Sequence, residues 1–442
     1  MTSIHKLSSE ALLPELDIFT VPPTQKSIER SYETQHRPIS SITGGNYLEF
    51  HIPTSKDEYI LMHETYLYVK MQLVMNKNDN TAMTEADWVW LKPANNLLHS
   101  MIKQVELKLG NREVTSSSNT YAYRAYFENL LGYGKSAKDT HLQCCLWNED
   151  AAERRGYFLP ATNNDKIGES KVVDLYGKLH VDLTFQGKAL IGGCDLQLKL
   201  ILNTTDFAFE YSNAVTLNHK IIDSSLFVHR LRAYPGLVTA HAKALALAPA
   251  KYPITRVEVK HIPIPSQSMD AVLDNIIIGQ LPRRLFLGCV SNKAFNGSRE
   301  KDPFRFEHFN ISQAICYLNG VQYPSNGYQP DFDKGNYIRE YSGLFQAMNM
   351  NSTESTIDIK RKEFADGKTI FGFNFAPDLS HGCDLVGHVN PINHGTLRIY
   401  LKFAKALAEV IDVVIFCEYD NIIEIDYERN IASDYKNTVK HV

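Results

Sequence analysis

Short runs in which apolar and polar residues alternate recur along the chain, and each predicts a β-strand with one buried face. Residues 397–403 alternate in this way, and residues 179–185 show the same pattern in the same phase. The two runs lie about half of the 442 residues apart. Because a shift of one residue turns every side chain of a strand to its other face, the shared phase indicates a duplicated fold.

Five more pairs of similar segments occur in the same order in the two halves. A strand that runs into a turn with Gly110 in the first half, and with Asn319 and Gly320 in the second, predicts positive φ angles at both turns. The last pair predicts a short amphipathic helix after each turn. Together these pairs predict two domains of common origin, each with its own core. The pairs are residues 195–200 with 412–417, 48–53 with 257–263, 66–69 with 285–290, 105–111 with 314–320, and 124–131 with 339–345.

Many short strands, long irregular loops and few helices predict an all-β chain. We expect a double jelly roll, that is, two tandem antiparallel sandwiches of about eight strands each, standing side by side, with short helices in the loops. The linker between them should contain a strand at 226–233 and an Ala-rich helix at 236–248. The expected limits are an N-terminal arm at 1–45, the first jelly roll at 46–217, the linker at 218–253, the second jelly roll at 254–430 and a C-terminal tail at 431–442.

The expected N-terminal arm contains four prolines and no sustained period, yet it also carries apolar residues. Two interpretations remain open: a solvated tail, or a segment that becomes ordered against a partner or a neighbouring subunit. The apolar residues are Leu12, Leu13, Leu16, Ile18, Phe19 and Val21.

The composition is that of a globular protein, with 44% hydrophobic residues, a formal net charge of −4 and a pI near 6.5. This charge argues against a basic surface that coats nucleic acid, so no sequence-specific nucleic-acid binding is expected. No run approaches the roughly 20 apolar residues of a membrane span, and the first residues do not resemble a signal peptide. We therefore expect a soluble chain made in the cytosol.

Seven cysteines without a C-x-x-C pair predict reduced thiols. Cys194, Cys289, Cys316 and Cys417 lie in apolar, strand-like sequence, and we expect them to be small buried side chains.

Two tripeptides resemble the end of a phosphate-binding loop, at residues 134–136 and 367–369. That motif needs a glycine five positions before its Gly-Lys pair, and those positions hold Asn129 and Lys362. Nucleotide binding is therefore not predicted.

One loop brings together His381, Cys383, His388 and His394, but their spacing matches no paired zinc motif, so uncommitted histidines are favoured. His180 alternates with apolar neighbours and is expected to face solvent. The chain has no H-x-H, no H-E-x-x-H and no G-x-S-x-G sequence. We therefore assign no catalytic, cofactor-binding or metal-binding residues and expect no cofactor.

The basic cluster at residues 360–362 follows strand-like residues 357–359. A solvated strand edge is favoured there over a nuclear-import signal. Trp88, Trp90 and Trp147 fit a sugar-stacking or subunit-contact patch as well as they fit core packing, and the sequence does not separate these readings.

Several passages resemble one family. Residues 395–407 and 416–426 resemble the carboxy-terminal signature of major capsid proteins encoded by Polinton (Maverick) elements and the related adintoviruses. Residues 95–107 and 119–123 resemble the first barrel of that family, and residues 373–379 resemble another of its passages. The resemblance covers most of the chain from about residue 46 to residue 430, and it is weak in the loops.

The resemblance implies a hexon-like double jelly roll whose homotrimers form pseudo-hexameric capsomers of an icosahedral double-stranded DNA virus or virus-like element. It implies no enzyme activity and no cofactor. The implied partners are further copies of the chain, the penton and other minor capsid proteins, and the implied location is the virion capsid after synthesis in the host cytoplasm. Two alternatives from other classes remain open, a double jelly-roll carbohydrate-binding protein and a metal-dependent bicupin-like enzyme.

Overall fold

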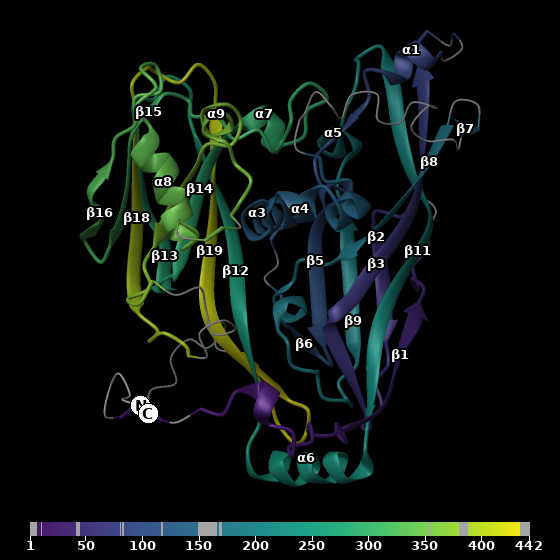
Figure 1. Cartoon of the computed structure of the whole chain (residues 1–442). Coiled ribbons are helices and arrows are strands. Elements are labelled where there is room, and N and C mark those ends of the chain that lie inside the picture. Colours follow the sequence, from purple (N-terminus) through teal and green to yellow (C-terminus); the bar gives the residue numbers. More distant parts are fainter. Residues whose placement is uncertain are drawn as a thin grey trace.

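The computed structural model shows a mostly β chain of antiparallel sheets, which confirms the expected fold class. Two sandwiches, here called the first and second barrel, stand side by side (Figure 1). The residues that the structure describes are 7–9, 11–40, 45–79, 81, 84–115, 118–148, 166–167, 170–351, 353–354, 356–379 and 388–433.

The first barrel has two sheets with the strand orders β1-β11-β3-β8-β7 and β2-β9-β5-β6, and a separate ribbon joins β4 to β10. The strands are β1 (Ile28–His36), β2 (Tyr47–Ile52), β3 (Glu58–Lys77), β4 (Lys92–Pro93), β5 (Ile102–Leu109), β6 (Arg112–Glu113), β7 (Lys166–Ile167), β8 (Ser170–Lys178), β9 (Leu196–Leu202), β10 (Phe209–Glu210) and β11 (Val215–Ala233).

The second barrel has the orders β12-β19-β14-β17 and β13-β18-β15-β16, with β20 paired to β19. Its strands are β12 (Ala250–Ile264), β13 (Asp270–Gln280), β14 (Arg284–Ser291), β15 (Ile311–Leu318), β16 (Val321–Tyr328), β17 (Ile370–Asn374), β18 (His394–Phe403), β19 (Ile411–Ile425) and β20 (Ile431–Ser433).

The two barrels share one topology. If the short accessory strands β4, β7, β10 and β20 are set aside, each barrel has eight strands, and in chain order these form a 1-8-3-6 sheet and a 2-7-4-5 sheet. This is the jelly-roll order, in which two Greek keys form the sandwich. The duplicated fold expected from the sequence is therefore confirmed at the level of topology.

Helices are short and lie mainly between strands. Helices α3 and α8 occupy the same place in the two barrels, between the fifth and sixth strands, and α6 joins the barrels at one end (Figure 1). The helices are η1 (Pro14–Leu16), α1 (Glu85–Trp88), α2 (Leu97–Ser100), α3 (Tyr121–Gly132), α4 (Lys135–Lys138), η2 (His141–Cys145), η3 (Asp182–Phe185), α5 (Thr205–Ala208), α6 (Pro235–Leu247), α7 (Asn292–Phe295), α8 (Ile338–Ala347) and α9 (Arg361–Ala365).

Three of the six sequence pairs join equivalent elements. The pairs at 66–69 and 285–290, at 105–111 and 314–320, and at 124–131 and 339–345 fall on the third strands, the fourth strands and the helices α3 and α8. The expected positive φ occurs at Gly110, with φ of 55°, and at Asn319, with φ of 49°.

The other three pairs do not join equivalent elements, so the equivalence predicted for them was wrong. Residues 179–185 form no strand, since they end in η3, and residues 195–200 lie largely in a seventh strand whereas 412–417 lie in an eighth. The pair at 48–53 and 257–263 joins a second strand to a first one. Alternation reports only that one face is buried, and several strands of a jelly roll share that property.

The expected limits of the arm and of the first barrel also need correction. Strand β1 lies within the expected arm and pairs with β11, from Ile28 opposite Ala233 to His36 opposite Leu226. Strand β11 crosses the expected limit at residue 217, so the strand predicted at 226–233 belongs to the first barrel. Strand β1 escaped detection because it is an edge strand with no fully buried residue. The linker helix was predicted correctly to within one residue at each end.

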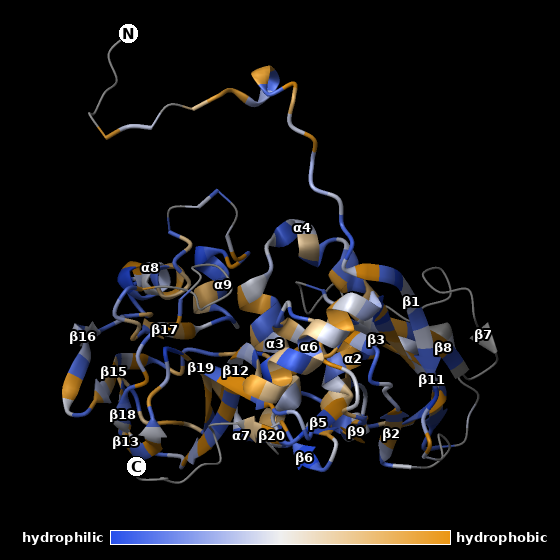
Figure 2. Ribbon diagram, turned by 90° about the horizontal axis from the view of Figure 1, so that it is seen from below, coloured by the Kyte–Doolittle hydropathy of each residue, from blue (hydrophilic) through white to orange (hydrophobic). Residues whose placement is uncertain are grey.

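The segment before β1 runs away from both barrels (Figure 2). Its six large apolar side chains, from Leu12 to Val21, are between 63% and 91% exposed. Within a single chain, these apolar groups therefore remain in contact with solvent.

We expect deletion of residues 1–24 to leave the melting temperature unchanged, because none of the described side chains there is buried. Deletion of residues 1–45 should lower it by several degrees, because it also removes β1 and exposes the edge of β11. Thermal unfolding followed by circular dichroism measures both effects. Equal melting temperatures for the two truncations would show that β1 adds no stability.

Candidate functional site at the junction of the two barrels

Helix α3 of the first barrel lies between the barrels and covers the outward face of the 1-8-3-6 sheet of the second barrel (Figure 1). Its residues Tyr123, Tyr126, Phe127 and Leu130 follow a helical spacing that puts them on one face. All four are buried, and they join one apolar cluster with second-barrel residues Val257, Val259, Phe286, Phe304, Phe306 and Phe416.

Ring contacts show how closely the two barrels pack. The ring centroids of Phe127 and Phe416 are 5.4 Å apart, and those of Tyr126 and Phe304 are 4.5 Å apart in a stacked arrangement. Full burial of one such side chain contributes about 1.5–3 kcal/mol. The junction is therefore a continuous hydrophobic core shared by the two barrels.

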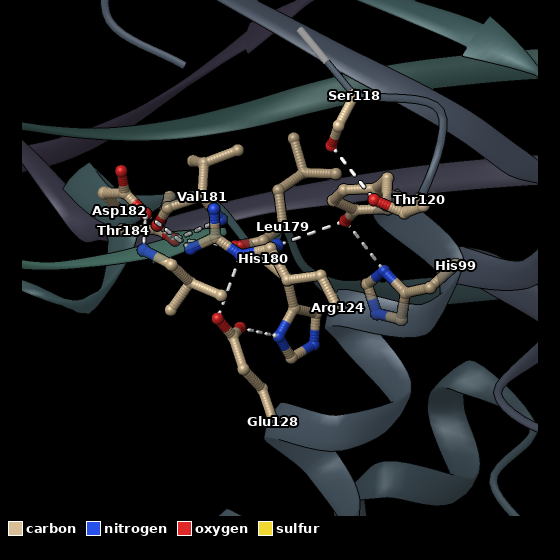
Figure 3. A network of polar contacts seen from close by, with 12 residues as sticks. His99, Ser118, Thr120, Arg124, Glu128, Leu179, His180, Val181, Asp182 and Thr184 are labelled. Carbon is tan, nitrogen blue, oxygen red and sulfur yellow. Dashed lines mark hydrogen bonds and ion pairs between the residues drawn. The ribbon is translucent and has the colours of Figure 1, made fainter. Parts of the chain in front are cut away.

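A buried polar network borders this core (Figure 3). Arg124 Nε lies 2.9 Å from Glu128 Oε1, and Arg124 Nη2 lies 2.7 Å from Asp182 Oδ1. His180 Nδ1 lies 2.6 Å from Glu128 Oε2. Arg124 and Glu128 come from consecutive turns of α3, while His180 lies just before η3 and Asp182 is the first residue of η3.

The network also reaches the backbone of the second barrel. The Val257 N–H donates to Asp182 Oδ1 at 3.2 Å, and the Thr120 hydroxyl donates to the Val259 carbonyl at 3.0 Å. The Val257 N–H and the Val259 carbonyl both lie on β12, which is an edge strand of its sheet. First-barrel side chains thus satisfy backbone groups that an uncovered edge would leave for water or another chain.

Burial and pairing set the ionisation of these groups. Burial raises the pKa of Asp182, although Arg124 opposes the shift. Burial also works against ionised Glu128, but Arg124 and His180 outweigh it and hold the pKa of Glu128 below its ordinary value. Burial, together with nearby His180, places the pKa of His99 well below its usual range, so its imidazole is neutral at pH 7.

A second cluster of charged side chains lies on the second-barrel side of the junction. Arg284 Nε lies 2.7 Å from Glu418 Oε2, and Arg283 Nη2 lies 3.1 Å from the same oxygen. A cavity of about 380 Å³ separates the two groups, and its walls include Arg124, Glu128, Arg284 and Glu418. Each ion pair joins residues of one barrel, Arg124 with Glu128 in the first and Arg284 with Glu418 in the second, so the charges facing this cavity are neutralised within each barrel.

Within the described ranges, no group of three or more His, Cys, Asp or Glu side chains could hold a metal ion. His381 and Cys383 of the expected histidine loop lie outside the described residues. His388 Nε2 lies 2.7 Å from Asp378 Oδ2, and His394 begins β18 with an exposed side chain.

The expectation for His180 was wrong, because this side chain is only 4% exposed and belongs to the network. The expectation assumed strand alternation, and residues 179–185 do not form a strand. The network was therefore missed. A usable signal was present in α3, where Arg124 and Glu128 stand four residues apart among apolar positions of a helix.

The four cysteines predicted to be buried are buried and free, which confirms that expectation. Cys194, however, lies outside the regular strands. The two tripeptides that resemble phosphate-binding loops lie apart, with Lys135 at the start of α4 and Lys368 Nζ 3.0 Å from Glu363 Oε2.

The basic cluster at 360–362 was expected at a strand edge, but Arg361 begins α9. Ile357 and Ile359 are buried without forming a strand, which explains the strand-like pattern. Trp88 and Trp147 are buried, whereas Trp90 is exposed, so the three tryptophans do not form one surface patch.

In the part of the chain that the structure describes, no helix combines the length and apolarity needed to cross a membrane.

Replacement of Asp182 by Ala should lower the free energy of unfolding by about 3–5 kcal/mol, because it leaves Arg124 and the Val257 N–H buried without this partner. Denaturant unfolding measures the change. The matched control is Asp366→Ala, which breaks an exposed ion pair with Arg305 and should cost at most about 1 kcal/mol. Equal losses for the two variants would contradict a stabilising role of the network.

No protein-family model matches the chain. An uncharacterized protein of Caenorhabditis elegans is 26% identical over 429 residues, which cover 94% of this chain and 99% of that protein.

Three solved structures are similar over nearly the whole chain. A chain of the Sputnik virophage has a TM-score of 0.62 and 11% identity, with 100% of this chain and 97% of that chain covered. The Faustovirus major capsid protein has a TM-score of 0.59 and 9% identity over 93% and 92% of the two chains. The mavirus major capsid protein has a TM-score of 0.58 and 9% identity over 100% of both. The chain thus has the double jelly-roll fold of these viral proteins.

Proposed function

We propose that this chain is the major capsid protein of an icosahedral double-stranded DNA virus or a virus-like Polinton element, and that it assembles as a homotrimer. The observation that carries the proposal is the presence of two barrels with one strand order, side by side in one chain. The similarity to viral major capsid proteins over both barrels supports it.

The geometry of tiling explains why two barrels serve this function. Three copies of a two-barrel chain place six similar barrels around a threefold axis, so that the assembly fills a hexagonal site of a shell. Most soluble oligomeric proteins are homo-oligomers with closed symmetry. Obligate contacts of this kind bury on the order of 2,000–5,000 Å² each and are rich in aromatic residues.

We infer a structural role without a reaction centre, because the buried charges at the junction are engaged with one another and with the backbone of β12. The proposed location is the virion capsid, where further capsomers, the penton and minor capsid proteins would be the partners. A nematode relative that matches along almost the whole chain favours an element carried in animal genomes.

We assign the apolar segment before β1 to contacts with neighbouring capsomers or minor capsid proteins, because its large side chains are exposed within the single chain. A variant that lacks residues 1–24 should still form the trimer but fail to form shells. Electron microscopy of assembly reactions measures the yield of shells. A normal yield from this variant would contradict the assignment, and loss of the trimer would show that the segment acts within the capsomer instead.

The purified chain should run as a stable trimer of about three times 50.2 kDa and appear as pseudo-hexagonal particles in negative-stain micrographs. Light scattering after size exclusion measures the mass. A strictly monomeric chain at high concentration would contradict the proposal. A carbohydrate-binding protein would instead give specific signals on a glycan array, which we do not expect here.

A further inference from the structure

The two barrels differ in how their equivalent faces are covered. Helix α3 covers the outward face of the 1-8-3-6 sheet of the second barrel. The same sheet of the first barrel, formed by β1, β11, β3 and β8, lies on the side of the molecule away from the second barrel (Figure 1). One face of this type is therefore buried within the chain, and its counterpart faces outward.

The outward face of the first barrel carries aromatic residues in the corresponding strands. In the second barrel, Phe286 of the third strand pairs with Phe416 of the eighth. In the first barrel, Tyr66 of the third strand pairs with Phe227 of the eighth. Tyr176 of the sixth strand stacks on Tyr66 with ring centroids 5.2 Å apart, and its side chain is 37% exposed. We call Tyr66, Tyr68, Tyr176 and Phe227 the aromatic face.

Helix α8 of the second barrel carries the matching apolar stripe. Its residues Ile338, Tyr341 and Phe345 have the spacing of Tyr123, Tyr126 and Leu130, which α3 buries against the second barrel. Ile338 is 50% exposed, while Tyr341 and Phe345 pack partly against the same cluster as α3 and stay partly exposed. The exposed parts of this stripe and of the aromatic face remain uncovered in the single chain.

Charged groups border both surfaces. The carboxylates of Glu33 and Glu64 lie near Tyr176, and those of Asp174 and Asp223 lie near Tyr68, with Lys70 on the strand between them. The exposed basic cluster Lys360, Arg361 and Lys362 lies beside α8. Two bonds fix it there: Arg361 Nη2 donates to the Gly335 carbonyl at 3.1 Å, and the Tyr341 hydroxyl donates to the Ile359 carbonyl at 2.9 Å.

We propose that helix α8 of one copy docks on the aromatic face of a second copy of this chain, with the basic cluster over the surrounding carboxylates. This inference rests on the proposed trimer and identifies its interface. The contact joins two different surfaces, so it is head-to-tail, and three such contacts close a ring. The contact between copies then repeats the packing of α3 on the second barrel.

The test places a charge in each surface separately. The Tyr176→Arg and Ile338→Arg variants should both run as monomers by size exclusion with light scattering, while keeping the circular dichroism spectrum of the folded wild-type chain. The matched control is Leu247→Arg at the end of α6, where the side chain is 89% exposed but lies on neither surface. This control should remain a trimer.

The outcomes separate this inference from the proposed function. If the wild-type chain and both variants are trimers, the interface lies elsewhere and the inference is wrong, while the capsomer proposal stands. If the wild-type chain is a monomer, the proposed function itself fails. If an arginine variant does not fold, Tyr176→Ser and Ile338→Ser replace it, and each should weaken the trimer at least about tenfold, or about 1.4 kcal/mol per contact. Unchanged affinity in the serine variants would also overturn the inference.

Discussion

The structure depends on the covering of one sheet of the second barrel by a helix of the first. Strand β14 is buried at all eight positions, and β19 is buried along most of its length, so neither has a solvent face. Such a sheet is stable only when both of its faces are covered. Inside the barrel, the 2-7-4-5 sheet covers one face, and outside it α3 covers much of the other. The second barrel is therefore completed by the first and is not an independent unit.

Polar groups give this hydrophobic contact its geometry. The aromatic side chains of α3 fill space, but they would tolerate small shifts along the sheet. The hydrogen bond from the Val257 N–H to Asp182 and the bond from Thr120 to the Val259 carbonyl fix two points along β12. Arg124 then holds Asp182 and Glu128 together, so α3 and the start of η3 keep one relative position.

Sequence patterns predicted the parts of the fold whose signal is local. Strands with one buried face, turns with a positive φ and the Ala-rich linker helix were all recognisable. Strand β1 was missed because an edge strand with a polar sequence has no alternation to detect. The Arg124–Glu128–His180–Asp182 network was missed because its members come from two segments that only the tertiary fold brings together, and because residues 179–185 imitate a strand. The three wrong pairs arose because an apolar pattern does not tell one strand of a sandwich from another: residues 412–417 are buried on both faces, and residues 179–185 form no strand.

The helix α6 that links the barrels has a consequence for the kinetics of assembly. Strand β11 ends at Ala233, α6 begins at Pro235, and β12 follows at Ala250, so almost no free chain separates the three elements. A tether this short keeps the local concentration of one barrel around the other in the millimolar range or above. In the proposed capsomer, half of the barrel-to-barrel encounters are then intramolecular and independent of dilution. The rate of ring formation should therefore depend on protein concentration as the association of three chains does. It should not depend on it as the association of six separate barrels would.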